Sequence, residues 1–347
     1  MRTITVDARA LEWFARDILE AHALEHGHAA LVAQSLLWAE LRGVPSHGVS
    51  RLPTYVQWLR SGEMSTAAQM RMNRCAPALA LLDADRAPGA VALDEAARTA
   101  ESLARECGTG TVFVRHTTHT GALGACTSGL AHAGFAAIAM AASGPNMIYH
   151  GAAVPGVSTA PLSIAIPRRG EPLVFDMASG ATALGRILQA RREGSPLPEG
   201  VAADAGGRPT RDAQLAVAPL PLGGPKGSGL ALMMELLCSA LAGAAILAPA
   251  LGDRATRQPH RQNALMLAID VQRLLPAGES AIAVEALADA IHSLPAAHGT
   301  EVLLPGERGG REQSRRAREG IPLSAGVATE LEALTASLDV TCPWSSS

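Results

Sequence analysis

The chain has 347 residues, of which 48% are hydrophobic and 18% are charged, so length and composition exclude an intrinsically disordered protein and suggest two or three folding units. The 29 Lys and Arg residues against 32 Asp and Glu residues give a formal net charge of −3, which leaves no cationic surplus for a nucleic-acid backbone. Aromatic residues make up only 3% of the chain, too few for a base-stacking surface. We therefore expect no nucleic-acid partner.

The same composition argues against a membrane protein and against a metal or disulfide framework. No uninterrupted apolar run approaches the roughly 20 residues that span a bilayer, and Asp7 and Glu12 interrupt the apolar stretch that a signal peptide would need. We expect no membrane association and a cytoplasmic location. The five cysteines form no C-x-x-C pair, so we predict neither disulfides nor a bound metal.

Helices are predicted for the N-terminal part of the chain. Apolar residues recur at helical spacing over residues 8–25, where Asp7 is the expected N-cap. Further helices are predicted at about 29–41 and 51–60, and the polar residues 42–48 between them form a turn.

Strands and helices alternate irregularly in the rest of the chain. Strands are predicted at residues 79–83, 111–115, 136–141, 163–166, 173–175, 264–269 and 302–304. Helices are predicted at residues 90–107, 121–133, 230–241 and 283–291, with a basic helical tail after the last strand. The segment 230–241 is apolar on nearly every face, which predicts a buried helix. This irregular order excludes a pure bundle or sandwich and predicts a mixed α/β fold.

The turn before the third helix holds the first candidate site. Ser46, His47 and Arg51 place a hydroxyl, an imidazole and a guanidinium close together at a helix entrance. Backbone N–H groups at a helix N-terminus favour anions, and an arginine adds a forked pair of donors for a carboxylate. His47 is able to move a proton near neutral pH. Spacing alone leaves open that His47 is a surface histidine and Ser46 a cap.

Three further segments carry candidate chemistry, each with a structural alternative. The sequence HTTHTGALG at 116–124 follows a predicted strand and begins a helix, a place that suits a cofactor phosphate or a catalytic base. The alternative is a polar loop without such a role. The sequence LGGPKGSG at 222–229 matches neither a P-loop nor G-x-G-x-x-G, yet Lys226 in a glycine-rich loop suits a phosphate. The alternative is a tightly packed helix entry. Asp176 ends an apolar strand, where it orients a histidine or simply caps the strand.

Together these segments resemble the malate/L-lactate dehydrogenase type 2 family, which includes ureidoglycolate and sulfolactate dehydrogenases and Δ1-piperideine/pyrroline-2-carboxylate reductases. The matching segments are RGVPSHGVSRLPTYVQWLRSG at 42–62, HTTHTGALG at 116–124, TAPLSIAIP at 159–167, EPLVFDMAS at 171–179, EGSPLPEGVAADAGGRPT at 193–210, LGGPKGSGLALMMELLCSALAGA at 222–244 and LLPGERG at 303–309. The resemblance implies an oxidoreductase that uses NAD or NADP and forms a homodimer. It also implies a non-Rossmann dinucleotide-binding fold with a largely antiparallel sheet plus a helical domain.

The resemblance also implies roles for individual residues. Ser46, His47 and Asp176 are expected to form a proton relay in which His47 delivers the proton, and the histidine His119 competes with His47 for the acid/base role. Arg51 is expected to clamp the substrate carboxylate, and Thr159 to contact the substrate. The expected cofactor-binding residues are His119, Thr120, Gly121, Ala122, Leu123, Ile164, Ala165, Ile166, Lys226, Gly227, Pro305, Gly306, Glu307 and Arg308.

The implied domain organisation follows from the same match. A helical substrate and dimer domain is expected at residues 1–75, joined by C-terminal helices within 311–340. An NAD(P)-binding mixed sheet domain is expected at 76–310, and it carries a Gly/Pro-rich arm at about 194–225.

Departures from the family pattern concern the substrate. Thr118 and Thr120 stand where the family commonly has Asn or His and an aromatic residue, and Ala160 replaces the Asn of Gly-Thr-Asn-Pro. The leading expectation is hydride transfer between the nicotinamide and the α-carbon of a small 2-oxo or 2-hydroxy acid. A cyclic 2-imino acid such as Δ1-pyrroline-2-carboxylate is the alternative, slightly favoured by the His-Gly-Ala sequence at 150–152. A second alternative is a non-catalytic nucleotide-binding protein.

Overall fold

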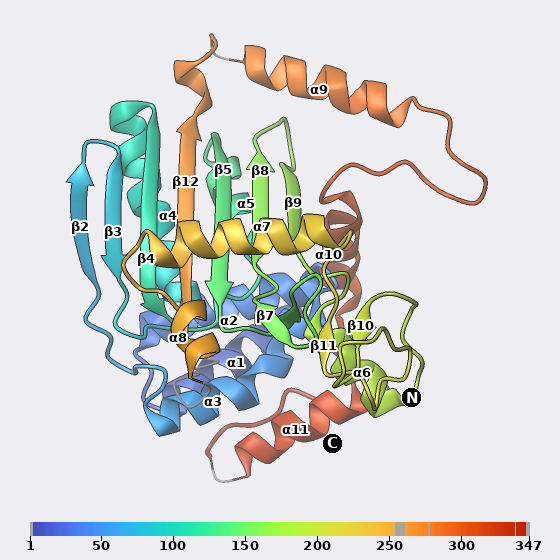
Figure 1. The fold of residues 1–347 in the computed structure, drawn as a ribbon. Helices are drawn as coiled ribbons and strands as arrows, with labels where there is room; N and C mark the ends of the chain where they lie inside the picture. The colour runs from blue at the N-terminus through green and yellow to red at the C-terminus, as the bar shows by residue number, and fades with distance from the viewer. Residues whose placement is uncertain (1–2, 254–260, 277, 337, 345–347) are drawn as a thin grey trace.

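The computed structural model describes residues 3–253, 261–276, 278–336 and 338–344. A seven-stranded sheet lies at its centre, with strand order β2-β3-β4-β12-β5-β8-β9 (Figure 1). Its strands are β2 (Arg71–Ala76), β3 (Leu79–Asp83), β4 (Thr109–Thr117), β12 (Gln262–Asp270), β5 (Phe135–Ser143), β8 (Pro161–Ile166) and β9 (Leu173–Ala178). The pair β3–β4 is parallel, and the other neighbouring pairs are antiparallel. The predicted mixed fold with a largely antiparallel sheet is confirmed.

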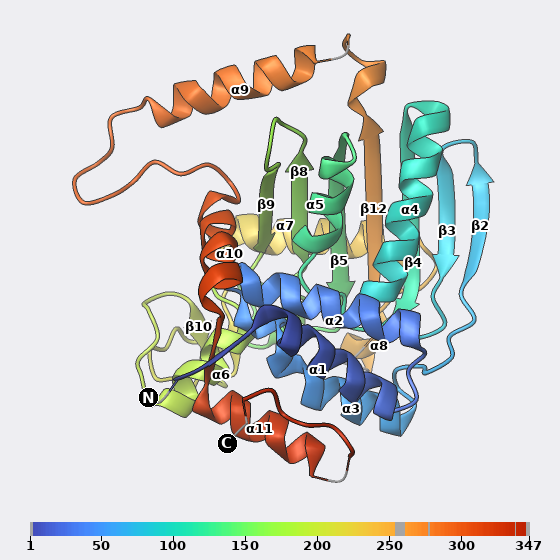
Figure 2. The same ribbon diagram turned by 180° about the vertical axis from the view of Figure 1, so that it is seen from behind.

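Helices cover both faces of this sheet. Helices α4 (Gly89–Cys107) and α5 (Gly124–His132) pack on one face, as Figure 2 shows, and α7 (Pro225–Glu235) crosses the other. Alternate residues of β4 and β5 are buried, which is the pattern expected when one face of a strand meets a helix. Gly110 allows α4 to approach β4 closely, because a Cβ there would overlap the carbonyl oxygen of Ala100.

A second hydrophobic core lies in a helical layer at one end of the sheet (Figures 1 and 2). This layer contains β1 (Thr3–Val6), α1 (Ala8–Ala21), α2 (His26–Leu41), α3 (Leu52–Ser61), β13 (Ile321–Ser324) and α11 (Ala325–Thr335). The predicted N-cap Asp7 is confirmed, because its carboxylate accepts the N–H of Ala10 at 2.9 Å. Strands β1 and β13 pair antiparallel, so the two ends of the chain meet in this layer.

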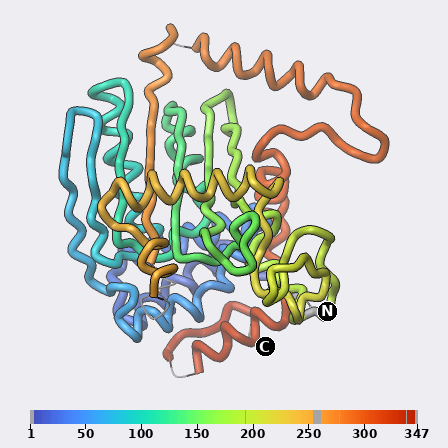
Figure 3. Tube along the Cα trace, viewed as in Figure 1, coloured from blue at the N-terminus to red at the C-terminus, as the bar shows by residue number. Residues whose placement is uncertain are grey.

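The remaining elements lie around the sheet and the helical layer. They are β6 (Met147–Ile148), β7 (Pro155–Val157), α6 (Leu184–Glu193), β10 (Ala202–Ala203), β11 (Ala218–Pro219), the π-helical turn Leu236–Ala240, α8 (Leu247–Gly252), α9 (Glu279–His292) and α10 (Glu307–Glu319). Helix α9 stands away from the body of the molecule (Figure 3), although Arg168 pairs with its Glu285 at 3.1 Å. Among the described residues, no helix is long and apolar enough to cross a membrane.

Two predictions about elements need correction. Residues 302–304 do not form a strand. The helix predicted at 230–241 begins earlier, at Pro225, and Met233 and Leu241 are 57% and 71% exposed because the helix lies on an open face of the sheet. Strands β1, β2 and β13 were not predicted from the sequence. Strand β2 lies at the sheet edge and is mostly exposed, so its sequence has no apolar alternation to detect.

Candidate functional site

The Ser46–Arg51 segment forms two short 3₁₀ turns between α2 and α3. The first covers Pro45–His47, and its proline occupies the first helical position, where a helix tolerates proline. The second covers Val49–Arg51. The Arg51 side chain bends back, and its Nε donates to the carbonyl oxygen of Ser46 at 2.7 Å. The hydroxyl, imidazole and guanidinium predicted from the sequence are therefore held in one compact turn.

The structure brings His47 and His119 together. Their ring centroids lie 5.5 Å apart with an interplanar angle of 30°. Ser46 Oγ and His47 Nδ1 share a hydrogen bond of 3.0 Å, and Tyr55 Oη and His119 Nδ1 share one of 2.7 Å. Each ring thus uses Nδ1 within the protein, which leaves Nε2 as the atom to exchange a proton with a ligand.

Burial and a nearby cation keep both imidazoles neutral at pH 7. Burial, with a further contribution from Arg51, lowers the pKa of His47 to about 4. Burial, Arg51 and His47 together hold the pKa of His119 well below its usual value. Burial also raises the pKa of Tyr55 to about 12, so its hydroxyl keeps its proton. An anion bound to Arg51 would offset the guanidinium charge and make His47 easier to protonate.

Asp176 on β9 contacts a different partner from the one expected. Its Oδ2 accepts the N–H of Gly124 at 2.7 Å, where α5 begins and a carboxylate is favoured by the helix dipole. Asp176 is exposed to solvent as a residue, but protein atoms crowd around its carboxylate. This burial raises the pKa of Asp176 to about 6, and the Gly124 N–H and Arg42 oppose the change. Within the described ranges, no hydrogen bond or ion pair joins Asp176 to His47.

Three helix N-termini meet at the edge strand β9. Helix α5 begins beside Asp176, as described above. The N–H of Val174 donates to the carbonyl oxygen of Pro305 at 3.2 Å, which docks the start of α10 on the strand. A Cβ on Gly227, in the first turn of α7, would lie 2.6 Å from the carbonyl oxygen of Ser179. The positive ends of three helix dipoles therefore converge on this edge, which favours a bound anion, while the first N–H groups of α5 and α7 are already bonded within the protein.

The expected cofactor residues differ in what they offer to a ligand. Lys226 and Arg308 are exposed at the first turns of α7 and α10. Leu123 and Ala165 are completely buried, so a ligand can reach only their backbone. The N–H of Gly227 is already bonded within its own loop.

The loop after β4 is fixed from the sheet side. The N–H and the hydroxyl of Thr120 both donate to Gln262 Oε1 at 2.9 Å, and the hydroxyl of Thr118 donates to a backbone carbonyl at 3.1 Å. Thr118 and Thr120, two of the three departures from the family pattern, are therefore buried hydrogen-bonding groups that hold the loop. The expected substrate contact Thr159 is half-buried, and its N–H donates to Asn146 Oδ1 at 2.8 Å.

Three other expected cofactor residues are placed as follows. The half-buried Ile164 and Ile166 lie on β8, next to β9. Glu307 accepts the N–H of Leu304 at 2.9 Å and pairs with His292 at 2.9 Å, so its carboxylate is engaged at the start of α10.

Three side chains that support the site were not predicted from the sequence. Tyr55 lies one helical turn beyond Arg51, and it is one of only two tyrosines, a signal that could have drawn attention to it. Arg42 donates to the carbonyl oxygen of Gly306 at 2.9 Å and so ties the turn to the start of α10. No sequence pattern pointed to Gln262 as part of the site, because it lies at the start of β12, far along the chain from the other site residues.

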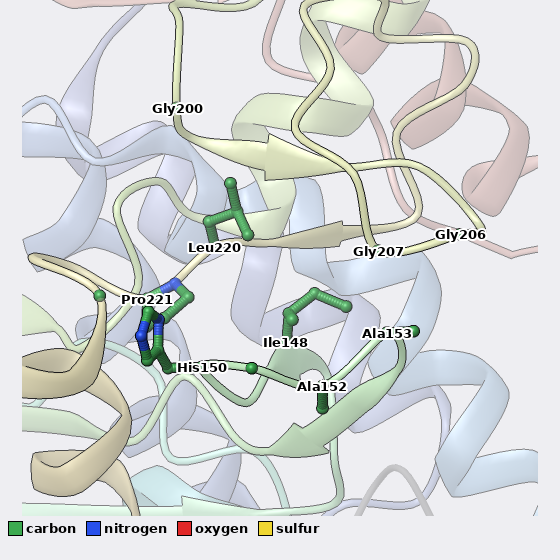
Figure 4. A pocket seen from close by; sticks show the side chains of 11 residues that line it. Ile148, His150, Ala152, Ala153, Gly200, Gly206, Gly207, Leu220 and Pro221 are labelled. Atoms are coloured by element: carbon green, nitrogen blue, oxygen red, sulfur yellow. The ribbon is translucent and has the colours of Figure 1, made fainter.

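A cavity of about 510 Å³ opens beside the start of α7 (Figure 4). Its lining comprises Ile148, His150, Gly151, Ala152, Ala153, Gly200, Gly206, Gly207, Leu220, Pro221 and Gly224. Neither His47 nor His119 lines it. Within the part of the chain that the structure describes, no three His, Cys, Asp or Glu side chains gather as ligands of a metal ion.

Comparison with known proteins places the chain in a defined group. A family model described as malate/L-lactate dehydrogenase matches residues 6–332. The chain is 31% identical to L-sulfolactate dehydrogenase of Methanothermobacter thermautotrophicus, over 94% of each protein. It is 33% identical to a Δ1-pyrroline-2-carboxylate/Δ1-piperideine-2-carboxylate reductase of Pseudomonas aeruginosa, over 91% of this chain and 95% of that one. The solved structure of malate dehydrogenase from Pyrococcus horikoshii superimposes with a TM-score of 0.89 at 26% identity, covering 98% and 97% of the two chains.

Proposed function

This chain belongs to the malate/L-lactate dehydrogenase family, and from that premise we propose that Arg51, His47 and His119 form its catalytic centre. The chain is an oxidoreductase that uses NAD or NADP. It transfers a hydride between the nicotinamide and the α-carbon of a small 2-oxo or 2-hydroxy acid. The observation that carries the proposal is the pair of neutral imidazoles, 5.5 Å apart, beside a guanidinium.

Arg51 would hold the substrate carboxylate. Its Nε is bonded to Ser46, so the two terminal nitrogens remain for a forked pair of hydrogen bonds to the two carboxylate oxygens. A carboxylate held there places the neighbouring α-carbon near both imidazoles. Such positioning is worth several kcal/mol of the reaction barrier, about 7 at best.

His47 would move the proton through Nε2. In oxidation, the neutral ring accepts the proton of the substrate hydroxyl, and Ser46 holds Nδ1 so that the ring faces the substrate. In reduction, the bound carboxylate offsets the charge of Arg51, so His47 takes up a proton and then donates it. The nicotinamide, when bound, gives or takes the hydride at C4.

The dinucleotide would lie along the β9 edge. The residues that would hold it are the 119–123 loop before α5, Lys226 at α7 and the 305–308 segment at α10. All three segments lie at helix N-termini, whose positive dipole ends suit a pyrophosphate, and Lys226 and Arg308 add positive charge. Asp176 would position α5 through Gly124 rather than relay a proton by direct contact with His47.

Cyclic imine reduction is the second candidate. It is favoured by the identity to the reductase of Pseudomonas aeruginosa and by His150, which lines the cavity beside α7. A 2-imino acid carries the same carboxylate, so Arg51 would serve both substrate classes. The proton would then go to nitrogen rather than oxygen.

The test is a reductase panel on the purified protein. Pyruvate, oxaloacetate, Δ1-pyrroline-2-carboxylate and Δ1-piperideine-2-carboxylate are each offered with NADH and with NADPH, and malate and sulfolactate are offered with the oxidised cofactors. We expect turnover with at least one 2-oxo or 2-hydroxy acid. Tight NAD(P)H binding without turnover of any compound would favour the non-catalytic alternative.

We also propose a homodimer in the cytoplasm and the two-domain division expected from the sequence. The exposed apolar residues of α7 and of the π-helical turn that follows it, such as Met233 and Leu236, suit a face that a second copy covers. Light scattering of the purified chain measures the oligomeric state directly.

A further inference from the structure

Glu40, in the last turn of α2, is a buried carboxylate that the proposed mechanism does not use. Its side chain is almost inaccessible to solvent, at 1% exposure. The nearest cation is Arg316 of α10, whose Nη1 lies 3.9 Å from Glu40 Oε2, too far for a hydrogen bond. Burying a carboxylate with so little compensation is unfavourable, so a specific contact must justify it.

That contact is with the catalytic turn. Glu40 Oε1 accepts the N–H of Val49 at 3.0 Å. The preceding residue is Gly48, and a Cβ there would overlap the Oε1 atom of Glu40. The carboxylate therefore fills the space beneath the junction of the two 3₁₀ turns. Its other oxygen, Oε2, has no hydrogen-bond partner among the residues that the structure describes.

The junction of the two 3₁₀ turns lies between His47 and Arg51, the two side chains to which the proposed function assigns proton transfer and substrate binding. Val49 is the first residue of the second turn, two positions after His47 and two before Arg51. It is buried at 1% exposure, so its N–H has no access to water. An unpartnered buried N–H costs about 1–3 kcal/mol, which the turn would relieve by shifting.

A second helix holds Glu40 in place. Arg316 Nη1 donates to the backbone carbonyl of Glu40 at 2.7 Å, and α10 begins at the segment expected to bind the cofactor. Arg316 lies in the last turn of α10, so this bond ties the backbone of Glu40 to the C-terminal end of that helix.

We propose that Glu40 is a positioning residue that sets the orientation of Arg51 and His47, because its carboxylate oxygen accepts the Val49 N–H that fixes the turn between them. The inference rests on the proposed function, in which Arg51 holds the substrate carboxylate. It predicts that substrate affinity depends on a hydrogen-bond acceptor at this position and not on a negative charge.

Two substitutions separate the acceptor from the charge. Glu40→Gln keeps an oxygen for the Val49 N–H and removes the charge, whereas Glu40→Met keeps the length of the side chain and removes the acceptor. The matched control is Glu235→Met in α7. Glu235 is also buried, at 5% exposure, and also accepts a backbone N–H, that of Leu247 at 3.2 Å, but it lies outside the turn.

Three measurements are made on the full chain. Calorimetry gives the affinity for oxamate, a pyruvate analogue, in the presence of NADH or NADPH, and fluorescence gives the dinucleotide affinity. Hydrogen exchange followed by mass spectrometry reports on the peptide that contains Val49. For Glu40→Met we expect about tenfold or more weaker oxamate binding, faster exchange in that peptide and dinucleotide affinity within about twofold of wild type. Glu40→Gln and Glu235→Met should match wild type in all three.

Several results would overturn the inference. One is unchanged exchange around Val49 in Glu40→Met; another is equal loss of oxamate affinity in Glu40→Gln and Glu40→Met. A third is a parallel loss of dinucleotide affinity in Glu40→Met, which would indicate a general structural role. If wild type binds no oxamate, the carboxylate site of the proposed function fails instead, and the exchange comparison alone still decides the role of Glu40.

Discussion

The buried Glu40 also makes a quantitative prediction about stability. Burial raises the pKa of Glu40 from 4.5 to about 7, although the Val49 N–H and Arg316 oppose that change. Between about pH 4.5 and pH 7, the folded protein therefore keeps a proton on Glu40 that the unfolded chain has already released. The stability contributed by the neutral side chain is fully present below about pH 4.5 and is lost as the pH rises through about 7.

The magnitude follows from the two pKa values. A change from 4.5 to about 7 corresponds to about 3 kcal/mol of unfolding free energy, at about 1.4 kcal/mol for each tenfold change in proton affinity. Glu40→Gln removes the titrating group and keeps the acceptor for Val49. Between about pH 4.5 and pH 8, wild type should therefore lose about 3 kcal/mol more stability than the variant.

Urea unfolding at a series of pH values measures this difference. Asp176 titrates in the same direction, with a pKa raised to about 6, but it is present in both proteins and cancels in the comparison. If the stability curves of wild type and Glu40→Gln run parallel over this range, the carboxyl is not held neutral by burial and the reasoning is wrong.

Four further substitutions test the site. Arg51→Lys should raise KM strongly for every active 2-oxo or 2-imino acid and leave dinucleotide affinity unchanged, because an ammonium cannot reproduce the forked contact; unchanged steady-state kinetics would rule out the clamp. His47→Ala should lower kcat about 10²-fold or more with little effect on dinucleotide affinity, whereas His119→Ala should weaken dinucleotide binding; fluorescence titration and NAD(P)H absorbance distinguish them, and the opposite pattern would exchange their roles. Tyr55→Phe should destabilise the protein by about 1–3 kcal/mol, because His119 Nδ1 loses its buried partner. An unchanged midpoint of urea unfolding would contradict this prediction.

The sequence by itself was enough to predict the helices and strands whose apolar residues recur at a regular spacing. Strand β3 was predicted with its observed bounds, and β4, β5 and α4 were predicted to within two residues at each end, because alternating or helical burial leaves a local pattern. The chemistry of the turn was also local, since Ser46, His47 and Arg51 are neighbours in the chain. The family followed from segments that are contiguous in sequence.

Only the tertiary structure decided which of these groups meet. His47 and His119 come from different elements, and their contact depends on how α3 and the loop after β4 pack together. Asp176 bonds to Gly124 because β9 lies against the start of α5, an arrangement that no local pattern encodes. Strands β1 and β13 exist as strands only because the ends of the chain pair with each other. The buried position of Glu40 likewise depends on the packing of α10 against α2, so a residue that resembles an ordinary helix-ending acid in the sequence becomes a fixed acceptor beneath the turn between α2 and α3.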